Sequence, residues 1–393
     1  MQNAVVITGA ARTPMGGMQG ELSSVAAPVL GAVAIKAALE RAKVDPASVD
    51  ETLMGCVLPA GLGQAPARQA SIGAGIPQTT GATTVNKMCG SGMKAVMIGY
   101  DGIASGNSTV IVAGGMESMS NAPYLLPKVR VGMRLGHGEM LDHMYIDGLE
   151  DVYQRGRLMG TFAEDCAAKY RFTREAQDAY AIASLTRAQQ AITSGAFKAE
   201  IAPVDVVTPR DARRVEIDEQ PGKAKLDKIP QLRPAFAKDG TVTAANSSSI
   251  SDGAAALILT TEAHAKATGQ VPLARILGHA THAHEPGWFT TAPVFAIQKL
   301  MKKLGWTDAD VDLYEVNEAF AVVAMAAMHD LKIAHEKINV RGGACALGHP
   351  VGASGARIIV TLMYALRDMG KRRGVASLCI GGGEATAVGI ELL

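Results

Sequence analysis

The chain has 393 residues, of which 48% are hydrophobic, 19% charged and 4% aromatic, so a large core is possible and disorder is disfavoured. Its 38 basic and 37 acidic residues leave a net charge of +1, and the lack of a basic stripe disfavours a nucleic-acid partner. No apolar run reaches the roughly 20 residues that span a bilayer, which disfavours a membrane protein.

The predicted elements alternate between strands and helices. A strand is expected at Val5–Ile7, a helix from Pro28 and a strand from Leu53 to Leu58. The same order returns in the far half, with a helix from Pro293 and a strand from Leu313 to Val316. This alternation predicts α/β layers.

A third feature also recurs. Val110–Ser118 resembles Ser377–Ala385, an alignment that places Val112 opposite Cys379 and Glu117 opposite Glu384. The three features keep nearly the same spacing, which predicts two copies of one α/β unit.

The middle of the chain fits neither copy. Residues 121–245 are rich in Met, Gly and Pro, and a helix is predicted there from Thr173 to Ser194. A structureless loop of this length is uncommon, so a lid-like subdomain is expected. The predicted domains are 1–120 plus 246–272 for the first half, 121–245 for the insertion, and 273–393 for the second half.

The five cysteines are widely spaced and include no C-x-x-C pair: Cys56, Cys89, Cys166, Cys345 and Cys379. An odd number without pairs disfavours a disulfide framework or a structural zinc site. The first strand follows the amino terminus without a charged leader. We therefore expect a reduced, cytoplasmic protein, in which one or more thiols serve for reactivity.

Cys89 stands between a strand-like run and a helical run, in Asn86-Lys-Met-Cys-Gly-Ser-Gly. Free N–H groups at a helix start favour the thiolate, so a lowered pKa is expected for Cys89. Gly90 and Gly92 leave room for a bulky electrophile. A small buried core thiol is the alternative interpretation.

Three further residues are candidates for chemistry. His349 precedes a proline, which places it on a turn where a base can face a cleft. Cys379 ends an apolar run before three glycines, and α/β folds hold their sites at such strand ends. Asn317 closes an earlier strand, although it could instead cap the following helix.

These segments together resemble the thiolases from end to end. The matching stretches are Asn86-Lys-Met-Cys-Gly-Ser-Gly, Gly114-Gly-Met-Glu-Ser-Met-Ser, Asn317-Glu-Ala-Phe-Ala, Gly348-His-Pro-Val-Gly-Ala-Ser-Gly-Ala-Arg and Cys379-Ile-Gly-Gly-Gly. Within the family, the chain is most similar to the acetyl-CoA acetyltransferases of the biosynthetic type, the acetoacetyl-CoA thiolases.

The resemblance implies an α/β thiolase fold of five layers, αβαβα, with two duplicated halves and an inserted CoA-binding loop domain. It implies reversible condensation of two acetyl-CoA to acetoacetyl-CoA and CoA through an acyl-cysteine, with ping-pong kinetics. CoA is then substrate and product, and no cofactor or metal is required. It also implies a role in fatty acid metabolism and a homotetramer built as a dimer of dimers.

The resemblance assigns roles by matched position. Cys89 would be the acylated nucleophile, His349 its base, and Cys379 the acid and base on the substrate carbon and the leaving CoA thiol. A thiol of ordinary pKa could do both near neutral pH. Asn317 with His349 would form one oxyanion site through a water, and the N–H groups of Cys89 and Gly381 the other.

Further positions are expected to bind substrate. Ser248 would contact the pantetheine, and Met159, Phe320 and Phe289 would line the acyl pocket. The complete set of expected substrate- and CoA-binding residues is Ser248, Met159, Phe320, Phe289, Lys228 and Phe236. Leu158 replaces a His of many relatives, and Pro221 stands where a CoA-contacting Arg is common. Lys223, Lys225 and Lys228 could supply charge to the CoA phosphates or simply form a solvated basic face. Phe289 replaces a common Met, which could alter the acyl chain-length preference.

Other functions remain open from the sequence. A 3-ketoacyl-CoA thiolase that degrades longer chains and a non-catalytic acyl-CoA carrier share the fold. A ketoacyl synthase is disfavoured because such enzymes lack a second cysteine in a Cys-Ile-Gly-Gly-Gly turn, and a nicotinamide enzyme because G-x-G-x-x-G is absent after the first strand. His279, His282 and His284 could bind a metal, but no neighbouring Cys or Asp completes the ligand set.

Overall fold

A computed structural model describes residues 4–209 and 212–393. Residues 1–3 of the predicted first half and 210–211 of the predicted insertion lie outside the described residues. The centre of the molecule is a large mixed sheet with the strand order β12-β13-β14-β11-β1-β10-β5-β3-β4. In chain order these strands are β1 (Val5–Arg12), β3 (Glu51–Gly55), β4 (Gly81–Val85), β5 (Val110–Ser118), β10 (Ser251–Thr261), β11 (Ala274–Ala283), β12 (Leu313–Val316), β13 (Arg373–Ile380) and β14 (Glu384–Leu392), and a short β2 (Gly16–Gly17) pairs with β10.

The sheet consists of two halves with the same internal order. In the first half β1, β10, β5 and β3 follow one another, and in the second half β11, β14, β13 and β12 do so. The halves join where β1 pairs with β11 in antiparallel fashion, at Val6–Arg275 and Ile7–Ala274. The two-copy prediction therefore describes the topology correctly.

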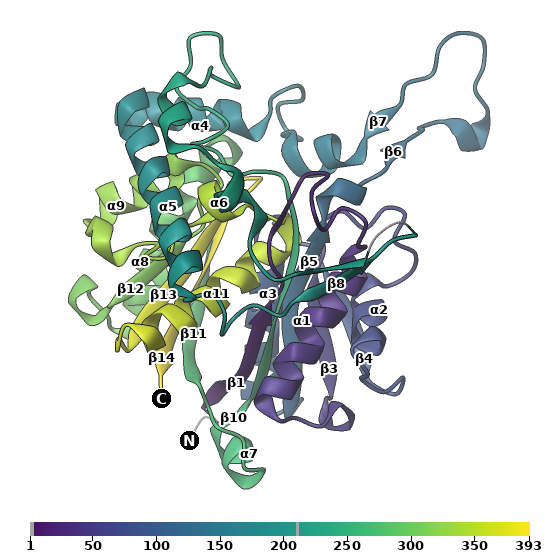
Figure 1. The fold of residues 1–393 in the computed structure, drawn as a ribbon, viewed down its shortest axis with the longest axis vertical. Helices are drawn as coiled ribbons and strands as arrows, with labels where there is room; N and C mark the ends of the chain where they lie inside the picture. The colour runs from purple at the N-terminus through teal and green to yellow at the C-terminus, as the bar shows by residue number, and fades with distance from the viewer. Residues whose placement is uncertain (1–3, 210–211) are drawn as a thin grey trace.

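The helices form three layers around the two half-sheets. The middle layer holds α3 (Ser91–Ala104) and α11 (Val351–Asp368), which pack on each other and on strands of both halves. The outer layers hold α1 (Ala27–Ala42) and α2 (Pro66–Gly73) on one side, and α8 (Ala292–Leu304) and α9 (Ala321–Leu331) on the other. Figure 1 shows this succession from right to left, and it confirms the αβαβα fold.

One detail of the predicted duplication is wrong. The Asp50 carboxylate accepts the N–H groups of Thr109 and Val110, and the Asp312 carboxylate accepts those of Arg372 and Arg373 in the same way. Val110 therefore corresponds to Arg373, four residues before the Ser377 of the sequence alignment. Val112 lies opposite Val375 and not Cys379, and Glu117 does not match Glu384. The glycine runs misled the alignment because they occupy different positions in the two strands.

The strand predicted from Leu53 to Leu58 is also too long. β3 ends at Gly55, and the next residues turn away from the sheet. The reason is Glu117, whose buried carboxylate accepts the N–H groups of Val57 and Leu58 at 2.9 and 3.1 Å. These two N–H groups are satisfied by a side chain, so they need no neighbouring strand.

The insertion carries secondary structure of its own. Its described residues include two short pairs of antiparallel strands and three α-helices. The longest α-helix confirms the predicted helix and has Thr173 as its N-cap. The elements are β6 (Tyr124–Leu125), β7 (Leu141–Asp142), the π-helix η4 (Tyr145–Leu149), α4 (Met159–Tyr170), α5 (Arg174–Ser194), β8 (Val204–Val207), β9 (Ala212–Val215), α6 (Glu219–Lys223) and the 3₁₀ segment η5 (Leu226–Gln231). Figure 1 shows α4, α5 and α6 beside the second half, and the β6–β7 arm projecting away from the body.

Short helices complete the connections: α7 (Glu262–Ala267), α10 (Ala344–Leu347), and the 3₁₀ turns η1 (Pro46–Ser48), η2 (Met119–Asn121), η3 (Val129–Val131), η6 (Pro286–Thr291), η7 (Asp308–Asp310) and η8 (His335–Lys337). Buried charges tie the insertion to the first half, because Arg12 at the end of β1 donates to Glu200 and Asp218. None of the described helices combines the length and hydropathy needed to cross a membrane.

Candidate active site

One cavity of about 380 Å³ is lined by residues from both halves and from the insertion. The structure brings most of the predicted site residues into its wall: Cys89, His349, Cys379, Gly381, Met159, Phe236, Ser248, Phe289 and Phe320. The two cysteines are thus far apart along the chain but face one space. Asn317 and Lys228 are not part of this wall.

Cys89 lies in a tight turn between β4 and α3. Met88 has a φ of 47°, in the left-handed region, and its N–H donates to the side chain of Asn86. Ser91 closes the turn, since its hydroxyl donates to the Met88 carbonyl and accepts the Lys87 N–H. A side chain at Gly90 would overlap Ile380, so this glycine allows the Cys89 turn to approach the strand that carries Cys379.

His349 occupies the equivalent place before the other central helix, α11. Its Nδ1 lies 2.6 Å from the hydroxyl of Ser354, and that hydroxyl donates its only hydrogen to the carbonyl oxygen of Pro350 at 2.9 Å. Ser354 must therefore accept from Nδ1–H, which leaves Nε2 as the unprotonated nitrogen. Nε2 is buried and has no hydrogen-bond partner within the described residues. It is free to accept a proton from a group in the cavity.

The pKa shifts in the site favour a neutral His349 imidazole and a protonated Cys89 thiol before substrate binds. Burial, together with the nearby Arg357 cation, lowers the pKa of His349 to about 3. Burial also raises the pKa of Cys89, although the backbone N–H groups of Gly381 and of Cys89 itself act in the opposite direction. The expected lowered pKa of Cys89 is therefore wrong: α3 begins only at Ser91, and desolvation outweighs the N–H groups. A thiol in this state needs a base.

Cys379 is the last residue but one of the buried strand β13 (Arg373–Ile380) and is 1% exposed. Burial and the neighbouring Cys89 raise the pKa of Cys379 well above its ordinary value, so the expectation of an ordinary pKa is also wrong. The following turn needs glycine: Gly382 and Gly383 have φ values of 91° and 85°, and a side chain at Gly383 would collide with the chain at His284.

Asn317 lies behind the cavity wall. It is buried, with Nδ2 3.5 Å from Nδ1 of His349 and Oδ1 3.5 Å from Nη2 of Arg357. The alternative role as a helix cap is wrong, because α9 has Phe320 as its N-cap residue. Asn317 therefore contacts the candidate base and not the helix that follows it.

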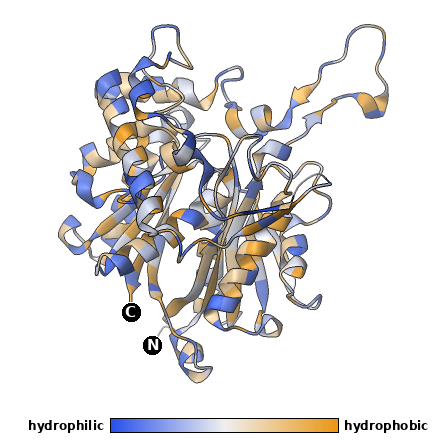
Figure 2. Ribbon diagram, viewed as in Figure 1, coloured by the Kyte–Doolittle hydropathy of each residue, from blue (hydrophilic) through white to orange (hydrophobic). Residues whose placement is uncertain are grey.

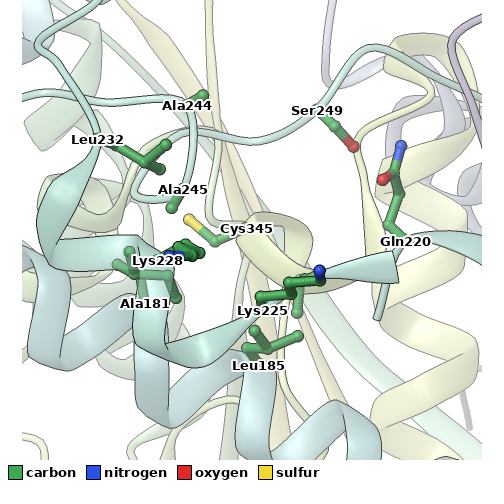
Figure 3. A pocket seen from close by; sticks show the side chains of 13 residues that line it. Ala181, Leu185, Gln220, Lys225, Lys228, Leu232, Ala244, Ala245, Ser249 and Cys345 are labelled. Carbon is green, nitrogen blue, oxygen red and sulfur yellow. The ribbon is translucent and has the colours of Figure 1, made fainter. Parts of the chain in front are cut away.

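Lys228 lines a second cavity of about 240 Å³, together with Lys225, Gln220 and Cys345. This second cavity shares Ala244 and Ser249 with the first. Figure 3 shows it from close by, with Lys225 and Lys228 on the same side as Leu185 and the sulfur of Cys345 near the centre. The two cavities are therefore neighbours.

Aromatic rings form the apolar end of the first cavity. The ring centroids of Phe236 and Phe320 lie 5.9 Å apart, and those of Phe289 and Phe320 lie 6.5 Å apart. Gly160, in the first turn of α4, makes room for the ring of Phe236, which a side chain there would overlap. The result is an apolar wall in the cavity that the two cysteines also line.

Sequence reasoning missed Ser354, Arg357 and Glu117. Ser354 and Arg357 stand in the same segment as His349, but nothing in that segment shows which side chain reaches the imidazole. Glu117 was recognised only as part of a repeat, whereas its carboxylate accepts an N–H from Gly352 at 2.8 Å, at the start of α11. This bond fixes the helix that follows His349.

The three histidines proposed as a metal site are engaged elsewhere. His279 contacts Asp101 at 2.9 Å and His284 contacts the carbonyl oxygen of Trp288 at 2.8 Å, while His282 stacks on Phe295. No group of three or more metal-ligating side chains is found in the part of the chain that the structure describes.

The chain is similar to known proteins over its whole length. Residues 5–263 match the family described as thiolase, N-terminal domain, and residues 270–392 match thiolase, C-terminal domain. Acetyl-CoA acetyltransferase 2 of Arabidopsis thaliana is 53% identical over 99% of this chain and 97% of its own, and the acetyl-CoA acetyltransferase of Schizosaccharomyces pombe is 48% identical over 98% of each.

Two solved structures share the fold. A thiolase from Ascaris suum in complex with coenzyme A has a TM-score of 0.94 at 42% identity, covering 99% of this chain and 100% of that one. The acetyl-CoA acetyltransferase of Bacillus anthracis has a TM-score of 0.97 at 41% identity, covering 100% of this chain and 99% of that one.

Proposed function

This chain belongs to the thiolase family, and we propose that it is an acyltransferase that reversibly condenses two acetyl-CoA molecules to acetoacetyl-CoA and CoA. The observation that carries the proposal is the meeting of Cys89, Cys379 and an unprotonated His349 Nε2 in one cavity. A protein that only binds acyl-CoA would need none of these three groups.

In the first step Cys89 is acylated. His349 Nε2 takes the thiol proton as the sulfur attacks the thioester carbon, and the carbon–sulfur bond to CoA breaks. The leaving CoA thiolate takes the proton of Cys379. Acetyl-Cys89, a Cys379 thiolate and a protonated His349 remain, and CoA departs as a thiol.

In the second step the carbon–carbon bond forms. The Cys379 thiolate removes a proton from the methyl carbon of a second acetyl-CoA, and that carbon attacks acetyl-Cys89. Cys89 leaves as a thiolate and regains the proton from His349, so all groups return to their starting state. The raised pKa of Cys379 suits this step, because a stronger base removes a weakly acidic carbon proton more readily.

Two donor sets stabilise the oxyanions in this proposal. The N–H groups of Cys89 and Gly381, which already act on the Cys89 sulfur, face the carbonyl of the acylated cysteine. Asn317 and His349 serve the enolate of the second substrate. A single donor of this kind contributes about 3–4 kcal/mol to a rate. CoA is substrate and product in this scheme, and it needs no resident cofactor.

The second cavity is a suitable place for the CoA phosphates. Lys225 and Lys228 line it. Lys228 lies 3.9 Å from the exposed carboxylate of Asp227, whereas Lys223 pairs with the nearly buried carboxylate of Glu219. A Lys228→Gln variant should raise KM for acetyl-CoA but not for acetyl-pantetheine, which has no nucleotide, and Lys223→Gln is the matched control. An unchanged KM for acetyl-CoA in Lys228→Gln, or the same rise in KM for both thioesters, would remove Lys228 from the site.

The aromatic wall favours short acyl groups over the long-chain alternative. Phe289 and Phe320 are 3% and 8% exposed and line the same cavity as Cys89, where their rings leave less room for a long acyl chain. The test is thiolysis of acetoacetyl-CoA and of 3-ketooctanoyl-CoA under the same conditions. We expect a clear preference for acetoacetyl-CoA in kcat/KM, and a preference for the longer substrate would favour a degradative thiolase.

We also propose a homotetramer, a dimer of dimers, on two features of the surface. Among the described residues the edge strand β4 pairs with β3 alone, so its other side could pair with a second copy. The β6–β7 arm carries exposed apolar side chains, among them Val131 and Leu135 at 85% and 107%, and Figure 2 shows the hydrophobic colouring on this projection. Sedimentation should give tetramers, and dimers when residues 127–139 are shortened; a monomeric parent chain would contradict this.

A further inference from the structure

Arg357 is a fully buried arginine that the proposed reaction does not use. It lies within α11, and its Nη1 faces Glu315 Oε2 at 3.5 Å, at the end of β12. Its Nε and Nη1 atoms have no hydrogen-bond partner within the described residues. The hydrogen bond found for this guanidinium goes from Nη2 to Oδ1 of Asn317, at 3.5 Å. A charge this deep in the core is costly, so its retention calls for a reason.

The hydrogen-bonding chemistry of Arg357 and Asn317 supplies a reason for keeping this buried charge. A guanidinium has five N–H donors and no acceptor, whereas an amide has an acceptor at one end and a donor at the other. Arg357 therefore stabilises only the orientation in which Asn317 Oδ1 faces it. In that orientation Nδ2 lies on the opposite side, 3.5 Å from the imidazole of His349.

The backbone of Asn317 does not fix the amide by itself. The Asn317 N–H donates to the Ser377 carbonyl oxygen and the Asn317 carbonyl accepts from the N–H of Ala319, and neither bond involves the side-chain amide. Glu315 in turn holds the Arg357 guanidinium, and both residues are almost completely buried. The chain of contacts runs from Glu315 through Arg357 and Asn317 to His349.

We propose that Arg357 is a positioning residue: by holding Oδ1 of Asn317 it keeps the amide donor, Nδ2, on the side of His349. Because Nδ1 of His349 already carries a hydrogen that it donates to Ser354, it cannot accept from Nδ2, and this donor remains available for the enolate oxygen. The inference rests on the proposed function, in which that donor serves the enolate of the second substrate. Acylation of Cys89 uses other donors, so loss of Arg357 should impair condensation more than acetyl transfer.

The test compares two reactions in the same variants. Exchange of acetyl groups between acetyl-CoA and labelled CoA reports acylation alone, and acetoacetyl-CoA formation reports both steps. Arg357→Met should lower condensation by about 100-fold, as expected for a misplaced donor, with exchange reduced far less. Asn317→Ala should show the same pattern, and the double variant should be no worse than Asn317→Ala.

Arg341→Met is the matched control, because Arg341 is also buried and pairs with Glu200 and Asp368 without touching Asn317. It should not separate the two reactions. Equal losses of both reactions in Arg357→Met, or additive losses in the double variant, would overturn the proposal. If Arg357→Met does not fold, Arg357→Lys decides in the same way: it keeps the charge without the planar fork and should lose part of the condensation rate.

The outcome is separable from the proposed function. If the unmodified chain catalyses neither exchange nor condensation, the proposed function is refuted. If the unmodified chain is active and the Arg357 variants are equally active, only the positioning role is refuted. A neutron crystal structure of the variant, which distinguishes the amide oxygen from the deuterated amide nitrogen, reports the amide directly in either case. We expect Asn317 Nδ2 to leave the imidazole, and an unchanged amide would contradict the inference.

Discussion

Removal of the Ser354 hydroxyl should impair the base without touching either cysteine. In Ser354→Ala the Nδ1–H of His349 loses its 2.6 Å acceptor, and an unsatisfied buried donor costs about 1–3 kcal/mol. The penalty falls on the tautomer whose Nε2 can accept the Cys89 proton. The other tautomer places its hydrogen on Nε2, toward the cavity, and becomes favoured by about 5- to 150-fold for that energy.

The acylation rate should fall by the same factor, since only the disfavoured tautomer can act as the base. Exchange between acetyl-CoA and labelled CoA measures this step, and KM should change little because Ser354 does not line the cavity. Ser71→Ala is the control: it also removes a buried hydroxyl, one that contacts Thr52 at 3.0 Å, away from the cavity. A parent-like exchange rate in Ser354→Ala would refute the assigned tautomer.

Two further predictions concern stability. A side chain at Gly115 would overlap the carbonyl oxygen of Gly352 at the start of α11, so Gly115→Ala should lower the free energy of unfolding by about 1–3 kcal/mol; urea denaturation without a change would contradict this packing. The pKa of His349 is lowered from its usual 6.5 to about 3 in the folded chain. Between pH 6.5 and pH 3 the unfolded chain therefore binds a proton at this residue that the folded chain does not. The free energy of unfolding should accordingly fall as the pH drops from 6.5 toward 3. His349→Gln should show a weaker loss of stability from pH 7 to pH 5 in urea titrations, and equal losses would contradict the neutral imidazole.

Local patterns predicted much of the fold. The helix from Pro28 and the long helix after Thr173 follow from apolar spacing, proline placement and a capping hydroxyl, which are properties of neighbouring residues. The end of β3 could not be predicted in this way, because Glu117 comes from a distant strand and takes the N–H groups of Val57 and Leu58. The alignment of the two halves was wrong for a similar reason: the correct correspondence is shown by the matching hydrogen bonds of Asp50 and Asp312, which only the folded structure reveals.

The site shows the same division. Cys89 and His349 stand in glycine-rich turns and Cys379 stands just before one, which marks all three in the sequence, and they share one cavity. Their protonation states were not predictable, because burial is a property of the assembled molecule and reverses the expected shift of Cys89. Ser354 and Arg357 were missed because only the assembled structure shows the contacts they make with His349 and Asn317.

The central claim is that Cys89 carries the acyl group while Cys379 removes the proton from the methyl carbon of the second acetyl-CoA. The most direct measurement is the mass of the Cys379→Ala chain after incubation with acetyl-CoA, with peptide mapping of the modified residue. The account predicts an acetyl group on Cys89 and no acetoacetyl-CoA in the mixture. An unmodified chain, or an acetyl group on a residue other than Cys89, would contradict it.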